Sequence, residues 1–167
     1  VLHEKQSYFV ENGLGRILSF CDIEQEMVTA DMIYRTCLSV YDQRVLYLPT
    51  GGLNQDLLEY RLSRQTASVL DLLEHYLGNV IVDVSSSNLE SSRKILQEAD
   101  LVVVNLCQNF QLLSHFFRNF SDIQKKAFYV IGNYCEESVI TKSTIAQSYN
   151  LPGSRIGTIP HNPRFAD

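Results

Sequence analysis

The chain has 167 residues, of which 45% are hydrophobic and 20% charged, enough for one domain with a hydrophobic core. Its net charge of −5 implies a mildly acidic surface, which gives no general electrostatic attraction to nucleic acid. No apolar run approaches the roughly 20 residues of a membrane-spanning helix, and no N-terminal stretch has a signal-peptide layout. We therefore expect a cytoplasmic protein, held at a membrane only through a partner or a further segment.

The cysteines and histidines show no spacing typical of a disulfide framework or a metal site. No two cysteines form a CxxC pair, which favours scattered reduced thiols. Of the histidines, only His161 lies near another candidate site residue. The cysteines are Cys21, Cys37, Cys107 and Cys135.

The first quarter of the chain is irregular. It predicts two short helices in a loop-rich region, one near 13–18 and one over 28–40, whose apolar residues pack on the edge of a sheet. No linker divides the sequence, so we expect residues 1–167 to form a single α/β domain. Because the chain begins at Val1 rather than Met, we expect that domain to be a fragment of a larger one.

From residue 44 onward, strand-like and helical patterns alternate. Gly78 is well placed to cap the first of the helices. Strands with almost no polar face are typical of a parallel sheet covered on both sides. The order predicts an α/β fold, a three-layer, doubly wound, mainly parallel sheet with helices on both faces. In chain order, the predicted elements are strand 44–48, helix 63–77, strand 80–82, helix 89–99, strand 101–106, helix 110–120, strand 127–131, helix 141–149 and strand 155–159.

Several well-known catalytic motifs are missing. The chain has no GxSxG elbow, no GxGxxG fingerprint after a strand and no Gly-Lys dipeptide, so it contains no GxxxxGK[ST] phosphate loop. These residues alone therefore cannot complete chemistry on a nucleotide.

Asp83 is the most informative residue. It closes the apolar run that begins at Asn79 and precedes a turn-forming stretch and a helix. An aspartate at the carboxyl end of a buried parallel strand lies where open α/β sheets bind ligands, and in phosphoryl-transfer enzymes it holds Mg²⁺. The alternative is that Asp83 only caps the next helix.

Other polar residues also follow predicted strands. Asn105, Asn133 and the segment Pro160-His161-Asn162 stand at or just past carboxyl ends, which share one edge in a parallel sheet. They form a possible ligand-binding line. Asn and Pro also end strands for purely structural reasons, and for Asn105 we prefer that interpretation.

Six segments carry short motifs that are informative together: Phe9–Leu18, Arg44–Gly51, Asn79–Ser86, Ala99–Val104, Val130–Asn133 and Ile156–Asn162. Each is weak alone, but together they span the whole chain. In this order and at this spacing, they resemble the C-terminal two-thirds of the MinD/ParA family of deviant-Walker P-loop ATPases.

The resemblance implies roles for particular residues. It implies Asp83 at the Mg²⁺ site, and Asn133 with Pro160, His161 and Asn162 around the adenine of ATP or ADP. The family's phosphate loop and signature lysine would lie upstream of this chain.

The chain departs from the family pattern at two of these motifs. Ser85 and Ser86 replace the prolines that follow the family's aspartate, and Asn162 replaces a common Asp. In having serines at these two positions, the chain resembles atypical members of the family, such as the TadZ/CpaE group, which place pili or secretion machinery.

The resemblance implies a bacterial, ATP-binding, dimerising ATPase that positions cargo such as a plasmid, a chromosome, the septum, a pilus or secretion machinery. Its partners would be a second copy and a cargo adaptor. An alternative is a non-hydrolysing scaffold of the same fold, which Ser85 and Ser86 favour. A phospho-receiver domain is a third possibility, but it needs an acidic pair after the first strand, where Leu48-Pro49-Thr50-Gly51 supplies none.

Overall fold

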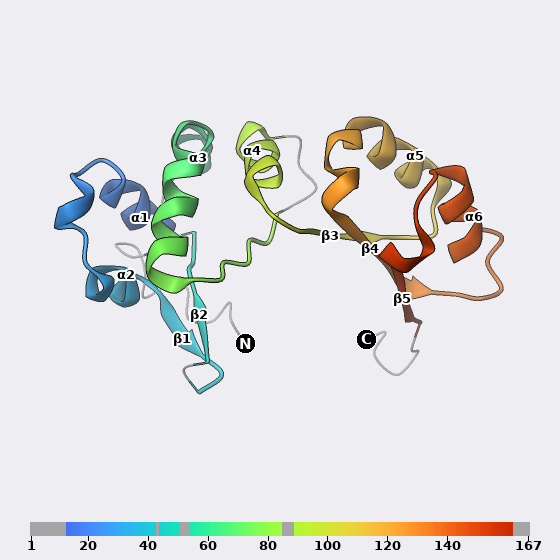
Figure 1. Cartoon of the computed structure of the whole chain (residues 1–167), viewed down its shortest axis with the longest axis horizontal. Helices are drawn as coiled ribbons and strands as arrows, with labels where there is room; N and C mark the ends of the chain where they lie inside the picture. The colour runs from blue at the N-terminus through green and yellow to red at the C-terminus, as the bar shows by residue number, and fades with distance from the viewer. Residues whose placement is uncertain (1–12, 43, 51–53, 85–88, 162–167) are drawn as a thin grey trace. The chain divides into compact units, whose positions relative to one another are not determined.

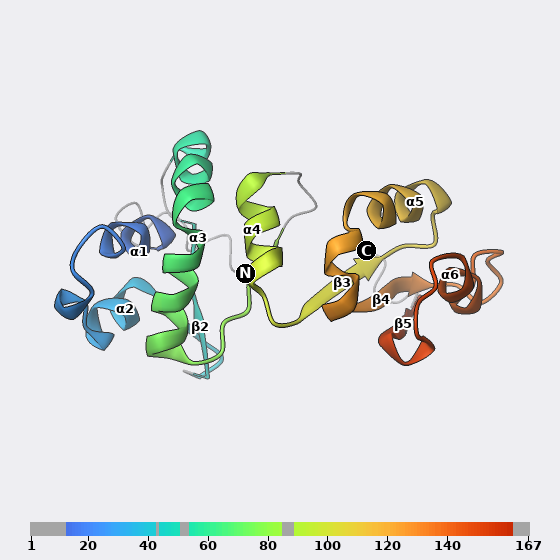
Figure 2. The same ribbon diagram turned by 45° about the horizontal axis from the view of Figure 1, so that its top comes forward.

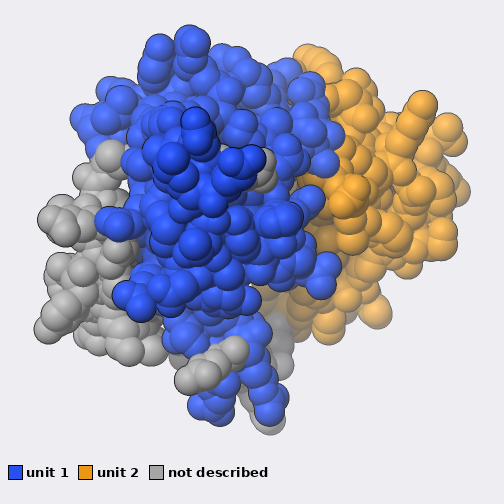
Figure 3. Space-filling model, turned by 60° about the vertical axis from the view of Figure 1, so that its left-hand side comes forward, with its two compact units in different colours: residues 1–98 blue, residues 99–167 orange. Residues whose placement is uncertain are grey.

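The computed structural model describes residues 13–42, 44–50, 54–84 and 89–161. The chain divides into two compact units, residues 1–98 and 99–167, which are coloured separately in Figure 3. Each unit has its own hydrophobic cluster and is described by itself.

The first unit is mainly helical (Figure 1). Its core gathers apolar side chains of the helices α1 and α3, with Val28 and the α2 residue Ile33. Arg61 of α3 donates to the carbonyl of Leu18 at 3.0 Å and pairs with Asp22, tying α3 to the end of α1. Its elements are α1 (Leu14–Phe20), η2 (Gln25–Met27), α2 (Ala30–Thr36), β1 (Leu38–Val40), β2 (Val45–Tyr47), α3 (Gln55–Leu77) and α4 (Glu90–Glu98).

The ends of α3 have clear chemical causes. The Asn54 side chain accepts from the backbone N–H groups of Asp56 and Leu57, so it caps the first turn. Gly78, at φ 78°, ends the helix as predicted. The helix begins at Gln55, earlier than the predicted residue 63, because the Asn54 cap lies upstream of the apolar spacing.

Two predicted elements near the N-terminus take a different form. The predicted helix 28–40 ends at Thr36, and Leu38–Val40 forms a strand that pairs antiparallel with Val45–Tyr47. The strand predicted at 44–48 therefore belongs to a two-stranded ribbon rather than to a parallel sheet. Its short length and neighbouring partner favour the local antiparallel pairing.

The second unit is an α/β layer with a parallel sheet of order β3-β4-β5 (Figures 1 and 2). The helices α5 and α6 pack against one buried set of strand side chains that includes Tyr129 and Ile131. The predicted α/β fold class is therefore confirmed. The elements are β3 (Val102–Leu106), α5 (Phe110–Asn119), η3 (Ser121–Lys126), β4 (Ala127–Tyr134), α6 (Lys142–Ser148), η4 (Gly153–Arg155) and β5 (Ile156–Pro160).

Strand register explains which side chains this sheet buries. Val102, Val104 and Leu106 alternate with exposed neighbours, so β3 turns one face to the helices. Its other face carries Val103, which is 64% exposed and pairs with Phe128, which is 43% exposed. This alternation contrasts with the predicted strand buried on both faces.

Candidate functional site

Asp83 does not lie at the end of a strand. Residues 79–84 have no assigned secondary structure, and Ile81 is 98% exposed, so the predicted strand 80–82 is wrong. A strand needs a neighbour for its backbone hydrogen bonds, and among the described residues no segment pairs with this one. The Asp83 side chain is exposed. Its assignment to Mg²⁺ stays a prediction.

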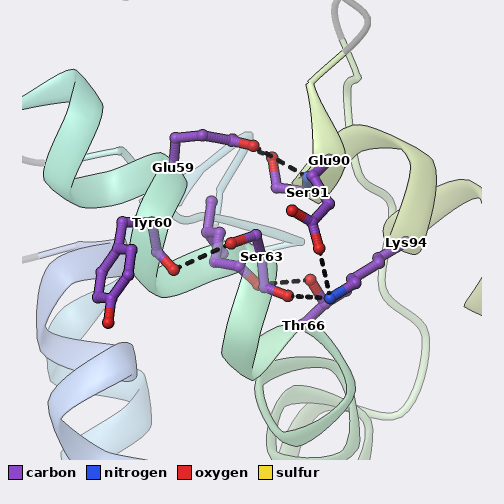
Figure 4. Close-up of polar contacts among 8 residues, drawn as sticks. Glu59, Tyr60, Ser63, Thr66, Glu90, Ser91 and Lys94 are labelled. Carbon is purple, nitrogen blue, oxygen red and sulfur yellow. Dashed lines mark hydrogen bonds and ion pairs between the residues drawn. The ribbon is translucent and has the colours of Figure 1, made fainter.

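The helix that follows Asp83 is anchored by Glu59 of α3 (Figure 4). One carboxylate oxygen of Glu59 accepts from the Ser91 backbone N–H at 3.0 Å, and the other accepts from the Ser91 hydroxyl. Ser91 is 4% exposed and lies in the first turn of α4, where unpaired N–H groups favour a negative charge. Glu59 thus takes the capping role that the alternative interpretation gave to Asp83.

A second polar contact joins the same two helices. Lys94 of α4 donates to the Ser63 carbonyl and forms an ion pair with Glu90 at 2.9 Å (Figure 4). Small hydroxyl residues line this contact, since Ser63 and Thr66 of α3 are both buried. The helical pattern predicted over 89–99 gave no sign of these polar contacts, and the residues of α4 that are buried, Ser91 and Ser92, are both polar.

In the second unit, Asn105 near the end of β3 lies beside the last residues of β4. The Asn105 side chain lies against Gly132: a Cβ added to Gly132 would come within 2.9 Å of the Asn105 Oδ1 atom. Gly132 therefore leaves room for this amide next to Asn133. The register pairs Leu106 with Ile131, which places both strand ends at one edge.

Asn133 has a left-handed backbone conformation at this edge. Its φ of 49° lies in the left-handed region, which Asn tolerates better than most residues. The strand pairing is irregular between Ile131 and Tyr134, so β4 continues past the predicted end at residue 131. The Asn133 side chain is exposed.

Pro160 and His161 reach the same edge from β5. Tyr134 pairs with Pro160, and the His161 backbone N–H donates to the Tyr134 carbonyl at 3.0 Å. Asn133, Pro160 and His161 are thus neighbours at the carboxyl end of two parallel strands, as the sequence predicted. Asn162 lies outside the described residues, and Asp83 belongs to the other unit, so their place at this edge stays a prediction.

A hollow of about 430 Å³ opens beside the end of β4. Sequence reasoning missed the residues that form it. The Thr141 side chain caps α6 by accepting from the Thr144 N–H at 3.2 Å, and the Lys142 N–H donates to the Tyr134 hydroxyl at 3.2 Å. The only sequence signal was Thr141 before a helical pattern. The lining residues are Tyr134, Thr141, Lys142, Ser143, Ala146, Gln147 and Gly153.

The loop between β4 and α6 is acidic and holds an exposed thiol. The Cys135 thiol donates to the Glu137 carboxylate at 3.0 Å, and this bond lowers the pKa of Glu137. A carboxylate that accepts a hydrogen bond stays charged to lower pH. The edge thus combines amide, imidazole and carboxylate groups.

These side chains fit part of a nucleotide site. Asn133 can both donate and accept, which suits a purine edge, and Pro160 offers a rigid surface. The described residues contain no group of three His, Cys, Asp or Glu side chains that could hold a metal ion.

Comparison with known proteins gives one solved structure. The fold resembles a ParA family ATPase from Chlorobium tepidum TLS, with a TM-score of 0.71 over 92% of this chain. The two sequences are 13% identical, so the likeness concerns the fold, and this chain spans 63% of that chain. The expected resemblance to a ParA-like protein is thereby confirmed at the level of the fold.

Two further comparisons found nothing. No protein-family model and no curated protein matches the chain. Within the described residues, no helix has both the length and the apolar character needed to cross a membrane.

Proposed function

We propose that this chain forms the adenine-binding part of a ParA-like, nucleotide-dependent ATPase. One observation carries the proposal: in a fold similar to a ParA family ATPase, Asn133, Pro160 and His161 gather at the carboxyl edge of a parallel sheet. Open α/β sheets bind their ligands outside that edge. The Asn133 side chain there can both donate and accept hydrogen bonds, as the edge of a purine can.

Each residue has a distinct part in this proposal. The Asn133 amide hydrogen-bonds the purine edge, and Pro160 packs against it without a competing N–H donor. The His161 backbone N–H is engaged by Tyr134, and its exposed ring lies beside the base or in solvent. Asn162 completes the adenine contacts.

Hydrolysis needs groups that these 167 residues do not include. Bound Mg²⁺ would neutralise charge on the phosphates, with Asp83 as its protein ligand. A phosphate loop with its lysine has to come from a preceding segment. We therefore expect the isolated chain to release no phosphate from ATP.

The proposal extends to assembly. ATP would bridge two copies of the protein, and hydrolysis would reset the dimer while an adaptor connects it to cellular cargo. These steps follow the family resemblance, and the cargo class stays open.

A non-hydrolysing scaffold of the same fold is the second candidate. It is favoured by Ser85 and Ser86 at positions where the family has prolines, and by the exposed Asp83, which no strand holds in place. In that case, the chain would share the fold of such ATPases without their nucleotide chemistry.

The test compares the intact protein, with any segment that precedes Val1, and the 167-residue chain. Mg²⁺-ATP hydrolysis by the intact protein should be abolished by Asp83→Ala, whereas Asp71→Ala, an exposed aspartate on α3, should leave it unchanged. Unchanged hydrolysis in Asp83→Ala would remove Asp83 from the site. An intact protein that neither binds nor hydrolyses ATP would favour the scaffold.

A further inference from the structure

Gln108 forms an unusual set of hydrogen bonds just after β3. Its side-chain oxygen accepts from the Cys135 backbone N–H at 2.7 Å. Its side-chain nitrogen donates to the carbonyls of Cys135 at 2.9 Å and Ile140 at 2.7 Å. A primary amide has two donors and one acceptor atom, and all three are used here.

These bonds close the loop between β4 and α6 at both ends. Cys135 follows β4 directly and Ile140 stands just before the Thr141 cap of α6. Within the loop, the Ser138 N–H donates to the Cys135 carbonyl at 3.3 Å and the Ile140 N–H to the Ser138 hydroxyl at 3.2 Å. Gln108 thus ties this loop to the segment that follows β3.

The loop continues directly from the candidate adenine edge. Cys135 lies two residues after Asn133 and next to Tyr134, whose carbonyl accepts from the His161 N–H. Asn133 holds a left-handed conformation, which costs energy and persists only when the surrounding structure holds it. A bond that fixes Cys135 therefore restricts the backbone that carries Asn133.

We propose that Gln108 is a positioning residue that sets the conformation of residues 133–140 and, through Asn133, the shape of the ligand-binding edge. The part that concerns a ligand rests on the proposed function, whereas the part that concerns the loop stands without it. Gln108 itself touches no ligand in this proposal.

The chemistry explains why this position requires an amide. A carboxylate at Gln108 would keep the acceptor for the Cys135 N–H but would face two carbonyl oxygens without a proton to donate. Alanine would remove all three bonds. Gln108→Glu and Gln108→Ala thus separate the acceptor bond from the two donor bonds.

The first measurement is backbone amide exchange by NMR on the full 167-residue chain. In Gln108→Ala, the Cys135 N–H should exchange roughly five times faster than in the unaltered chain, the effect of losing one hydrogen bond. Gln108→Glu should keep the Cys135 N–H protected but shift the resonances of residues 138–142. Gln111→Ala, an exposed glutamine in the first turn of α5, is the matched control and should change neither.

Acidification adds a readout that simple loss of packing would not give. A protonated glutamic acid can again donate one hydrogen bond, so lowering the pH below the ordinary range of a glutamate should return the resonances of Gln108→Glu toward those of the unaltered chain. Gln108→Ala should show no such recovery. If both variants keep the exchange and resonances of the unaltered chain, Gln108 does not position this loop.

The second measurement uses adenosine as the probe. If the unaltered chain shows adenosine-dependent shifts at Asn133, Gln108→Ala should weaken that binding roughly tenfold, and equal binding would overturn the ligand part of the proposal. If the unaltered chain shows no response, the adenine edge itself fails, and the loop part is decided by the exchange data. Circular dichroism of each variant verifies that the fold is retained.

Discussion

Replacing Glu59 by alanine tests whether one carboxylate anchors the helix that follows Asp83. The substitution removes both hydrogen bonds to Ser91, one from its backbone N–H at 3.0 Å and one from its hydroxyl. Because Ser91 is 4% exposed, both donors would be left with little access to water. The change therefore creates unpaired polar groups and also removes a charge from the N-terminus of α4.

The expected cost follows from these contacts. A hydrogen bond to a charged group contributes about 1.5–3 kcal/mol, and loss of a helix cap costs about 0.5–2 kcal/mol. Glu59 is itself half-buried, so water can replace part of the loss. We expect Glu59→Ala to lower the free energy of unfolding by about 2 kcal/mol, and Glu59→Gln, which keeps an acceptor, by about 1 kcal/mol.

Urea unfolding followed by circular dichroism measures both values. The midpoint should fall while the slope of free energy against urea stays the same. Glu74→Ala is the matched control, because Glu74 is an exposed glutamate of the same helix, and it should stay within about 0.5 kcal/mol of the unaltered chain. A Glu59→Ala protein as stable as this control would refute the anchoring role.

Three further experiments test other parts of the structure. Gly13→Ala should lower the free energy of unfolding by at least about 2 kcal/mol, because Gly13 has φ 93° and an added Cβ would lie 2.3 Å from the Pro49 carbonyl oxygen. The control is Gly153→Ala, whose added Cβ meets no atom within 4 Å and which should be nearly neutral in the same urea assay. Tyr129→Phe should leave stability unchanged or raise it by up to about 1 kcal/mol, since the Tyr129 hydroxyl is buried with no hydrogen-bond partner in the described part of the chain. Burial also raises the pKa of Tyr129, so the folded state holds this proton more tightly and loses stability as the pH rises above 10. Tyr129→Phe should therefore reduce the loss of stability at alkaline pH. An equal loss in both proteins would contradict the raised pKa of Tyr129. A thiolate-selective reagent at pH 8 should modify Cys107 and Cys135 before Cys21 and Cys37, because the first two thiols are exposed and burial raises the pKa of the other two. Mass spectrometry of the labelled peptides gives the order of modification, and early labelling of Cys37 would contradict this prediction.

The second unit was largely predictable from sequence. Its strands are apolar runs closed by turn residues, and its helices follow short polar caps such as Asn109 and Thr141, so local chemistry marks each boundary. The neighbouring positions of Asn133 and Pro160 follow from parallel strand ends alone. Gln108 was missed because its partners are backbone groups 27 and 32 residues away, and a side chain that binds a distant backbone leaves no periodic pattern.

The first unit was harder to predict for a different reason. The run Val80-Ile81-Val82 has strand-like composition, yet whether it becomes a strand depends on a partner backbone rather than on its own residues. The same holds for Leu38–Val40, which an apolar spacing assigned to a helix and which the ribbon with Val45–Tyr47 converts to a strand. Glu59 gave no signal, since a glutamate in a helix is usually a solvated residue.

The position of β3 has a practical consequence for handling the chain. In the order β3-β4-β5 it is an edge strand, and among the described residues no segment pairs with the outer side of its backbone. The sequence Val102-Val103-Val104-Asn105-Leu106 contains no lysine or other charged residue and no proline, the residues with which natural edge strands block unwanted pairing. Concentrated solutions of the isolated chain will therefore be prone to strand-to-strand aggregation through β3, and solubility will depend in part on how well this edge is shielded.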